Sequence, residues 1–239
     1  MLQLSLCVNG INNDLLNDFK QNLKEYVLAK SGVFSVFEKD DFLYYLIVLN
    51  LDDTQDSEMF IKQKIAQLII NSFKCNLVEN NLKYEFSRDY KYLALVQALI
   101  NFDSACDESY IIQKLDLSSG ELYIQFFYYF CCKILKEKWA QLIEITNQNS
   151  HLFNVQENYL DVLRFLLDGI DKKASINVEA QNNKLKVQRA DEIILFNSYS
   201  ELIAYIIKNN PQSIELKNVD KSFADFVKQL FLTRVTLCL

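Results

Sequence analysis

Turn-forming residues are scarce in this chain, whose 239 residues include a single proline, Pro211, and four glycines. A β-sandwich needs many tight turns, and glycine and proline are among the residues that most often form them. Half of the residues are hydrophobic, which is enough for a substantial core and argues against disorder. We therefore expect an α+β protein with long helices.

The N-terminal part of the chain has the pattern of a small β-α-β-β unit. Leucine and valine alternate with other residues at the very start, which is the period of a half-buried strand. Capping residues then precede an amphipathic helix, and two apolar runs flank a charged turn. The predicted elements are a strand Leu2–Val8, a helix capped at Asn12, Asn13 or Asp14 and ending near Gly32, and two strands, Val33–Phe37 and Phe42–Leu51, around the turn Glu38–Asp41.

A helical region follows. Ile61, Ile65 and Leu68 fall at offsets that place them on one face of a helix. The stripe at Tyr159–Leu166 has apolar residues on nearly every side, which is typical of a helix buried on two faces. Further helical stripes occur at Tyr92–Leu99, Asp107–Leu115 and, in a long segment after Gly120, Phe127–Trp139.

The aromatic run Leu122–Cys132 in that long segment has several interpretations. Aromatic residues at helical spacing usually fill an interior, so core packing is the first interpretation. A groove for a protein partner and a pocket for an apolar ligand are the alternatives.

After Gly169 the pattern changes to that of a mixed sheet with two helices. Short alternating runs on either side of Asn182-Asn183 predict a hairpin. We expect packed subdomains at residues 1–53 (N-terminal α/β), 54–170 (helical) and 171–239 (C-terminal α+β). The predicted C-terminal elements are a hairpin with Ile176 and Val178 opposite Leu185 and Val187, a strand Ile193–Phe196, a helix Ser200–Lys208, a strand around Ile214 and Leu216, a helix with Phe223–Phe231, and a strand Val235–Cys238.

The charge distribution argues against a nucleic-acid-binding protein. The formal charge is −6, and the excess acidity lies before His151, where 14 Lys and Arg face 20 Asp and Glu. Nucleic-acid binding depends on a basic face that neutralises phosphates. The only cluster of basic residues that approaches such a face surrounds the predicted hairpin, and we interpret this cluster as a solvated surface. Its residues are Lys172, Lys173, Lys184, Lys186 and Arg189.

Cysteine usage and hydropathy indicate a cytoplasmic protein without a membrane span. The six cysteines are scattered through apolar segments and form no CxxC pair, which favours reduced thiols that pack as small hydrophobes. The first thirteen residues carry no Lys or Arg, whereas a signal peptide would begin with a positively charged region. The longest uncharged runs are far shorter than the ~20 apolar residues that span a bilayer.

No motif for catalysis, metal binding or cofactor binding can be assembled from the sequence. His151 is the only histidine, and a lone histidine in a polar stretch is more often solvated than catalytic. The four glycines are isolated, so neither a phosphate-binding loop nor a dinucleotide fingerprint is present. We therefore expect no catalytic residue, no metal site and no cofactor.

Two further groups of reactive residues have structural interpretations. Cys131 and Cys132 are adjacent, and we expect two buried thiols, with redox sensing as the alternative. The acidic pairs occur where turns and helix starts are predicted, so we interpret them as caps and as partners of the helix dipole. These pairs are Asp40-Asp41, Asp52-Asp53 and Asp107-Glu108.

The end of the chain resembles the YtxC-like sporulation proteins of low-GC bacteria. The segments Ile214–Asn218, Phe226–Phe231 and Arg234–Cys238 look like that family's final strand, helix and strand, and Glu157–Leu167 is similar to its helix before a hairpin. The family is known by a biological process and not by a reaction. The resemblance therefore implies a role in spore formation and implies no catalyst.

Together these features predict a non-enzymatic cytoplasmic protein that acts through contacts with another protein. Arg234, between the last helix and the last strand, is the one candidate interaction residue, because it could reach a carboxylate on a partner. A structural salt bridge is the alternative role for Arg234. The alternative function is a small-ligand-binding protein or an atypical enzyme, with a pocket between the helical region and the C-terminal sheet.

Overall fold

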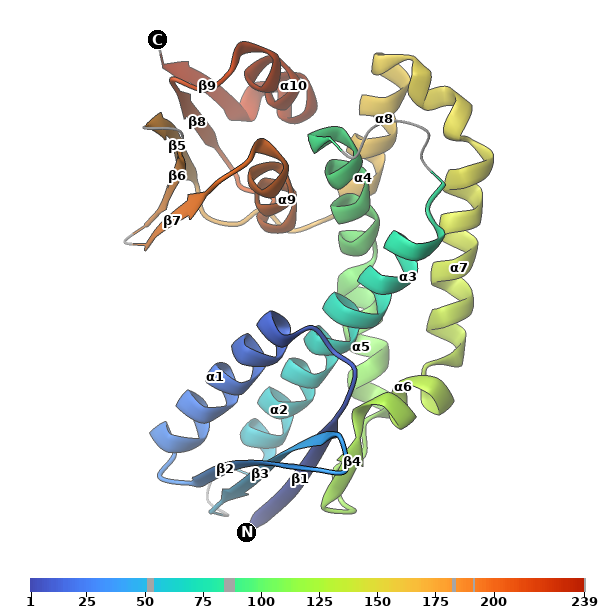
Figure 1. Cartoon of the computed structure of the whole chain (residues 1–239), viewed down its shortest axis with the longest axis vertical. Coiled ribbons are helices and arrows are strands. Elements are labelled where there is room, and N and C mark those ends of the chain that lie inside the picture. Colours follow the sequence, from blue (N-terminus) through green and yellow to red (C-terminus); the bar gives the residue numbers. More distant parts are fainter. Residues whose placement is uncertain (51–53, 84–88, 182–183, 191, 239) are drawn as a thin grey trace. The chain divides into compact units, whose positions relative to one another are not determined.

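The computed structural model of the chain (Figure 1) describes residues 1–50, 54–83, 89–181, 184–190 and 192–238. The chain divides into two compact units. Unit 1 comprises Met1–Asn80 and Ser104–Gln141, and unit 2 comprises Asn81–Asp103 and Leu142–Leu239. The predicted α+β fold class is confirmed, with a β-α-β-β start, a helical middle and a C-terminal mixed sheet. The helical middle contributes residues to both units, and the predicted subdomain boundary at residue 53 lies outside the described residues.

Unit 1 begins with the predicted β-α-β-β unit. Its elements are β1 (Leu2–Val8), α1 (Asn13–Ala29), β2 (Val33–Lys39) and β3 (Phe42–Leu49). The side chain of Asn12 caps α1 by accepting a hydrogen bond from the backbone N–H of Asp14 at 2.8 Å. Asp40 and Asp41 turn the chain between β2 and β3 with φ of 52° and 63°, values that aspartate tolerates better than most residues. The predicted end of the second strand at Leu51 lies outside the described residues.

The four-stranded sheet of unit 1 has the order β2-β3-β1-β4. Its last strand, β4 (Glu121–Tyr123), pairs in parallel with β1 at Ser5, Leu6 and Cys7. The sequence predicts one long helical segment after Gly120, whereas the structure has β4, α6 (Ile124–Cys131) and α7 (Lys133–Gln148), with a break at Cys132. A three-residue strand is too short to show a period of two, so local pattern could not reveal it.

The core of unit 1 lies between this sheet and the helices on one side of it. Figure 1 shows α1 and α2 (Thr54–Ile69) together on that side. Leu16, Phe19 and Leu23 of α1 are buried against the sheet, and the rings of Phe19 and Tyr45 meet edge to face at 5.6 Å. The remaining helices of unit 1 are η2 (Ile70–Lys74), α3 (Cys75–Asn81, whose last residue belongs to unit 2) and α5 (Ser104–Lys114).

Unit 2 contains a five-stranded sheet of order β7-β6-β5-β8-β9. The predicted C-terminal elements are all present, while the predicted turn Asn182-Asn183 lies outside the described residues. Side chains that alternate along the strands, such as Val178, Val187 and Leu216, are buried beneath the two C-terminal helices. The elements are β5 (Ile176–Gln181), β6 (Lys184–Arg189), β7 (Glu192–Phe196), α9 (Tyr199–Asn209), β8 (Ile214–Lys217), α10 (Lys221–Phe231), η4 (Leu232–Arg234) and β9 (Val235–Cys238).

Unit 2 also contains the last part of α7, from Leu142, and three further helical segments: α4 (Tyr90–Asn101), η3 (Ser150–Asn154) and α8 (Gln156–Leu167). The apolar periphery of α8 predicts a helix buried on two faces. Tyr159, Leu160, Leu163, Leu166 and Leu167 are buried, whereas Phe165 is 66% exposed. Across the described residues of both units, no helix combines the length and apolar character needed to cross a membrane.

Candidate functional site

The sheet of unit 1 carries aromatic side chains on the face that points away from α1 and α2. Successive side chains of a strand point to opposite faces, and Tyr45 and Ile47 of β3 are buried on the helix side. Tyr44 and Leu46 therefore point to the other face. We call this surface the open aromatic face and define it by Phe37, Phe42, Tyr44 and Tyr123 from the strands and Phe126 from α6.

The rings of the open aromatic face contact one another in a continuous series. Phe37 stacks on Tyr44 at a centroid distance of 4.8 Å, and Phe42 lies 6.5 Å from Tyr44. Phe42 meets Tyr123 edge to face at 5.7 Å, and Tyr123 stacks on Phe126 at 5.5 Å. These are the distances of favourable aromatic pairs. The series joins the β2–β3 hairpin to the β4–α6 segment, which is far from it in the sequence.

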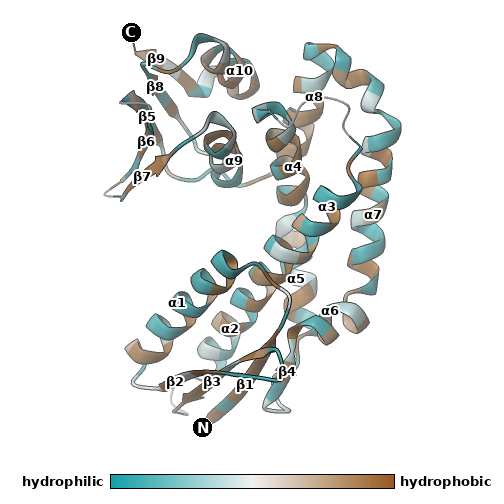
Figure 2. Cartoon of the chain, viewed as in Figure 1, coloured by the Kyte–Doolittle hydropathy of each residue, from teal (hydrophilic) through white to brown (hydrophobic). Residues whose placement is uncertain are grey.

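The two ends of this series are open to solvent: Phe37 is 42% exposed and Phe126 is 53% exposed. The rings between them, Phe42, Tyr44 and Tyr123, are half-buried. Leu46 and Val33, on the same side of the sheet, are also exposed. Figure 2 shows hydrophobic colouring along β3, whose apolar residues occupy both faces of the sheet. Monomeric proteins rarely expose large contiguous apolar patches, and such patches mark sites of interaction.

The sheet of unit 2 provides an internal comparison. Its helices α9 and α10 also cover one face (Figure 1), and the opposite face is polar except for Ile193 and Leu195 on the edge strand β7. Lys217 and Glu179 form an ion pair at 3.4 Å there. A polar open face is what contact with water favours, so the aromatic open face of unit 1 is the exception. The polar side chains on the face in unit 2 are Asn177, Glu179, Lys186, Gln188, Glu215 and Lys217.

Exposed aromatic residues continue along α6 beyond Phe126. Ile124 and Phe127 are buried, but Tyr129 is exposed and Phe130 is 80% exposed. Interpreting the run Leu122–Cys132 wholly as core is therefore wrong for this side of the helix. The ammonium group of Lys136 lies 4.9 Å from the Tyr129 ring, a distance at which a cation is attracted to the ring.

Unit 1 also carries most of the net negative charge of the chain. It has 11 Lys and Arg against 16 Asp and Glu, whereas unit 2 has 14 against 15. Asp40 and Asp41, at the β2–β3 turn, and Glu121, on β4, lie at the margins of the open aromatic face. Interpreting the pair Asp40-Asp41 as turn residues is confirmed; the pair Asp52-Asp53 lies outside the described residues.

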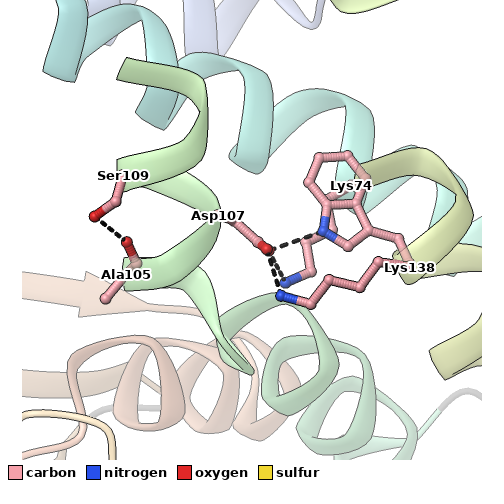
Figure 3. Close-up of polar contacts among 6 residues, drawn as sticks. Lys74, Ala105, Asp107, Ser109 and Lys138 are labelled. Atoms are coloured by element: carbon pink, nitrogen blue, oxygen red, sulfur yellow. Dashed lines mark hydrogen bonds and ion pairs between the residues drawn. The ribbon is translucent and has the colours of Figure 1, made fainter. Parts of the chain in front are cut away.

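A buried charged cluster lies in the same unit, and it corrects the interpretation of Asp107 as a capping residue. Asp107 is in the first turn of α5, but its carboxylate is fully buried and contacts three side chains (Figure 3). It lies 2.9 Å from Lys74 Nζ and 2.8 Å from Lys138 Nζ, and it accepts a 2.8 Å hydrogen bond from Trp139 Nε1.

This cluster connects three helices of unit 1. Lys74 is only 1% exposed and ends the π-helical segment η2, Asp107 is in α5, and Lys138 and Trp139 are in α7. A buried lysine needs a partner of opposite charge, but Lys74 has the polar neighbours Asn71, Ser72 and Asn76, so the sequence carried no clear signal of its burial. The identity of that partner, more than thirty residues away, could not be read from the sequence.

Arg234 is held within unit 2 by neutral acceptors. Its Nη1 donates to Asn210 Oδ1 and to the backbone oxygen of Pro211, each at 2.9 Å. Its guanidinium group lies 4.7 Å from the Phe231 ring, and burial lowers the pKa of Arg234. These contacts stabilise the loop after α9 and involve no carboxylate, so contact with a partner's carboxylate stays a prediction.

The other reactive residues do not converge. His151 is exposed in η3. Cys132 is buried, and this burial raises its pKa to about 12, but Cys131 is exposed, so the expectation of two buried thiols is wrong for Cys131. Within the described ranges, no three His, Cys, Asp or Glu side chains are placed to hold a metal ion.

Compared with known proteins, the chain matches no protein-family model, no curated protein and no solved structure. The resemblance to the YtxC-like proteins stays a prediction that depends on the segments quoted above.

Proposed function

We propose that this chain is a non-enzymatic protein that binds another protein through the open aromatic face of unit 1. The observation that carries the proposal is the contrast between the two sheets. Each sheet has a face turned away from the pair of helices packed on its other side. In unit 2 this face is mostly polar, whereas in unit 1 polar Gln3, Ser5 and Ser35 share it with a connected series of aromatic rings that includes Phe126 of α6. Aromatic residues are enriched at the centres of protein interfaces, where they contribute most of the binding energy.

The charge of unit 1 defines the chemistry of this partner. An apolar segment flanked by basic side chains would cover the rings and meet Asp40, Asp41 and Glu121 at their margins. Complementary charge raises association rates and selects partners. A second copy would bring two acidic units together, so we propose a different protein. The same acidity disfavours nucleic acid as the partner.

We further propose that the protein is located in the cytoplasm and that it acts in a developmental programme such as spore formation. Six cysteines scattered through the sequence without a CxxC pair support the first part, and the resemblance of the C-terminal segments to YtxC-like proteins supports the second.

The test compares affinity purification with matched variants of the full chain. Leu46→Ser lies beside the open aromatic face, and Leu195→Ser makes the same change on an exposed strand position of unit 2. A double variant, Phe37→Ser with Phe126→Ser, removes two of the rings. We expect wild type and Leu195→Ser to retain the same partner from the native organism.

The face variants should bind that purified partner at least about tenfold more weakly, because truncating a central interface residue costs about 1–2 kcal/mol or more. Binding should also weaken as salt is added, since charge complementarity is screened. Equal affinity of wild type and both face variants for the purified partner would exclude the open aromatic face as the binding site.

A further inference from the structure

Unit 2 contains a cavity of about 450 Å³ at the C-terminal ends of α8 and α10. Asn210, the left-handed residue after α9, also lines it. Three cationic residues from different elements reach this cavity: Arg164 from α8, Lys172 from the loop before β5, and Arg234 from η4. The only acidic residue in its lining is Asp168.

The cationic groups retain unused hydrogen-bonding capacity. Arg164 donates from its two terminal nitrogens to Asp161 Oδ1 at 2.6 Å and to the backbone oxygen of Gln229 at 2.7 Å. Its Nε is shielded from solvent and has no acceptor among the described residues. Arg234 donates to Asn210 Oδ1 and to the backbone oxygen of Pro211 from a single nitrogen, Nη1. Lys172 is exposed and has no ion pair within the described part of the chain.

Two of the three cationic groups have no carboxylate partner within the described part of the chain. Arg164 pairs with Asp161 at 2.6 Å, whereas the acceptors of Arg234 are neutral and Lys172 is exposed. With Asp161 and Asp168 counted, the side chains carry one net positive charge, and the C-terminal ends of α8 and α10, roughly −0.5 of an elementary charge each, offset about that much. The attraction for an anion therefore comes from the directed, charge-assisted hydrogen bonds that Arg234 and Lys172 can donate to a carboxylate or phosphate group.

Apolar side chains form the rest of the wall. Phe165, Leu230 and Phe231 line it, together with Leu232, which adopts a φ of 52°. A leucine held in this region is strained by about 1–3 kcal/mol, and such strain concentrates at ligand sites. The cavity therefore combines an apolar wall with convergent polar groups, both of which small-molecule sites use.

We propose that this cavity binds a small organic anion that has an apolar body and a phosphate or carboxylate group held by Lys172 and Arg234. The apolar body lies against Phe165 and Leu232. This site is in unit 2 and is independent of the open aromatic face.

Isothermal titration calorimetry of the full chain with phenyl phosphate, benzoate and inorganic phosphate tests the proposal. Sodium chloride at equal ionic strength serves as the control for screening. We expect phenyl phosphate or benzoate to bind at concentrations below about 10 mM, and the stronger of the two identifies the anionic group. Inorganic phosphate should bind more weakly than phenyl phosphate, because it lacks the apolar body.

Lys172→Gln is the informative variant, because Lys172 is exposed and its replacement should leave the fold intact. It should weaken binding about tenfold, which corresponds to about 1.4 kcal/mol. Lys184→Gln, an exposed lysine of β6 outside the cavity, should bind like wild type. No binding of either organic anion at about 10 mM, or equal affinity of wild type and Lys172→Gln, would overturn the proposal.

Discussion

Replacing Asp107 with asparagine removes the negative charge of the buried cluster in unit 1 and keeps the shape of the side chain. Lys74 Nζ lies 2.9 Å from the Asp107 carboxylate, and both side chains are almost inaccessible to water. In the Asp107→Asn variant the ammonium group of Lys74 stays buried without this counter-charge. Lys138 differs, because 38% of its side chain is exposed and water can solvate its charge.

The expected loss of stability follows from this difference in burial. Removing one member of a buried ion pair costs about 3–5 kcal/mol, because the remaining charge is left without compensation. We expect Asp107→Asn to lose that much free energy of unfolding. Lys138→Met should lose about 1 kcal/mol or less, since exposed ion pairs contribute little.

A double variant separates the ion pair from the packing. Lys74→Met combined with Asp107→Leu removes both buried charges and keeps similar volumes. Apolar replacement of a whole buried pair is often close to neutral, although Trp139 Nε1 loses its acceptor. The double variant should therefore be more stable than Asp107→Asn. Glu58→Gln, which removes an exposed partner of Lys62 on α2, is the matched control and should change stability by less than about 0.5 kcal/mol.

The single tryptophan of the chain gives a direct assay. Trp139 is 1% exposed and donates to Asp107, so its fluorescence reports on the unfolding of unit 1 in urea. Midpoints and slopes yield the free energies of unfolding. If the free energy of unfolding of Asp107→Asn lies within about 1 kcal/mol of the wild-type value, the conclusion that this carboxylate compensates a buried lysine is refuted.

Three further predictions concern thiols, pH and backbone packing. Iodoacetamide at neutral pH should label Cys131 in the folded chain and leave Cys132 unmodified until urea is added, because only Cys131 is exposed; mass spectrometry reads out the sites, and equal labelling would contradict the structure. Burial raises the pKa of Cys132 from 9.0 to about 12. The unfolded state therefore loses the thiol proton at lower pH than the folded state does. The stability that the buried, protonated thiol contributes should be intact below pH 9 and should decline between pH 9 and about 12. The Cys132→Ala variant should show a flatter decline of the urea midpoint over that range, and an unchanged decline would argue against this cause. Gly32→Ala should cost at least about 2 kcal/mol in thermal or urea unfolding, because a Cβ there would lie 2.5 Å from the backbone oxygen of Val48; a neutral effect would show that β3 can move away.

Local patterns in the sequence predicted most of the elements. The alternation Ile176, Val178 and Leu185, Val187 gave the hairpin β5–β6, and the stripe at Phe223–Phe231 gave α10. Such elements are readable because the spacing of apolar residues within a few turns decides which face is buried. The C-terminal element order was predictable for the same reason.

Elements and contacts that depend on distant segments were not predictable. β4 becomes a strand only because β1, more than a hundred residues earlier, offers it a free edge. The burial of Asp107 follows from the positions of Lys74 and Lys138 around it. No local window contains both partners of these contacts.

The candidate site was partly encoded in the sequence. The run Phe42–Leu49 is apolar or aromatic at every position, which indicates a strand with apolar residues on both faces. Sequence reasoning treated such residues as core, whereas α1 and α2 cover only one face of this sheet. For Arg234, position in the sequence suggested a contact with a partner, and the structure supplies neutral acceptors within the chain.

The amino-acid sequence by itself determined the α+β class, the order of most helices and strands, and the apolar and aromatic character of β3 on both of its faces. Only the tertiary structure decided which of those aromatic residues meet water, and which charged groups are enclosed together. The physical reason is that burial depends on what lies opposite a side chain in space, whereas periodicity records only its neighbours along the chain.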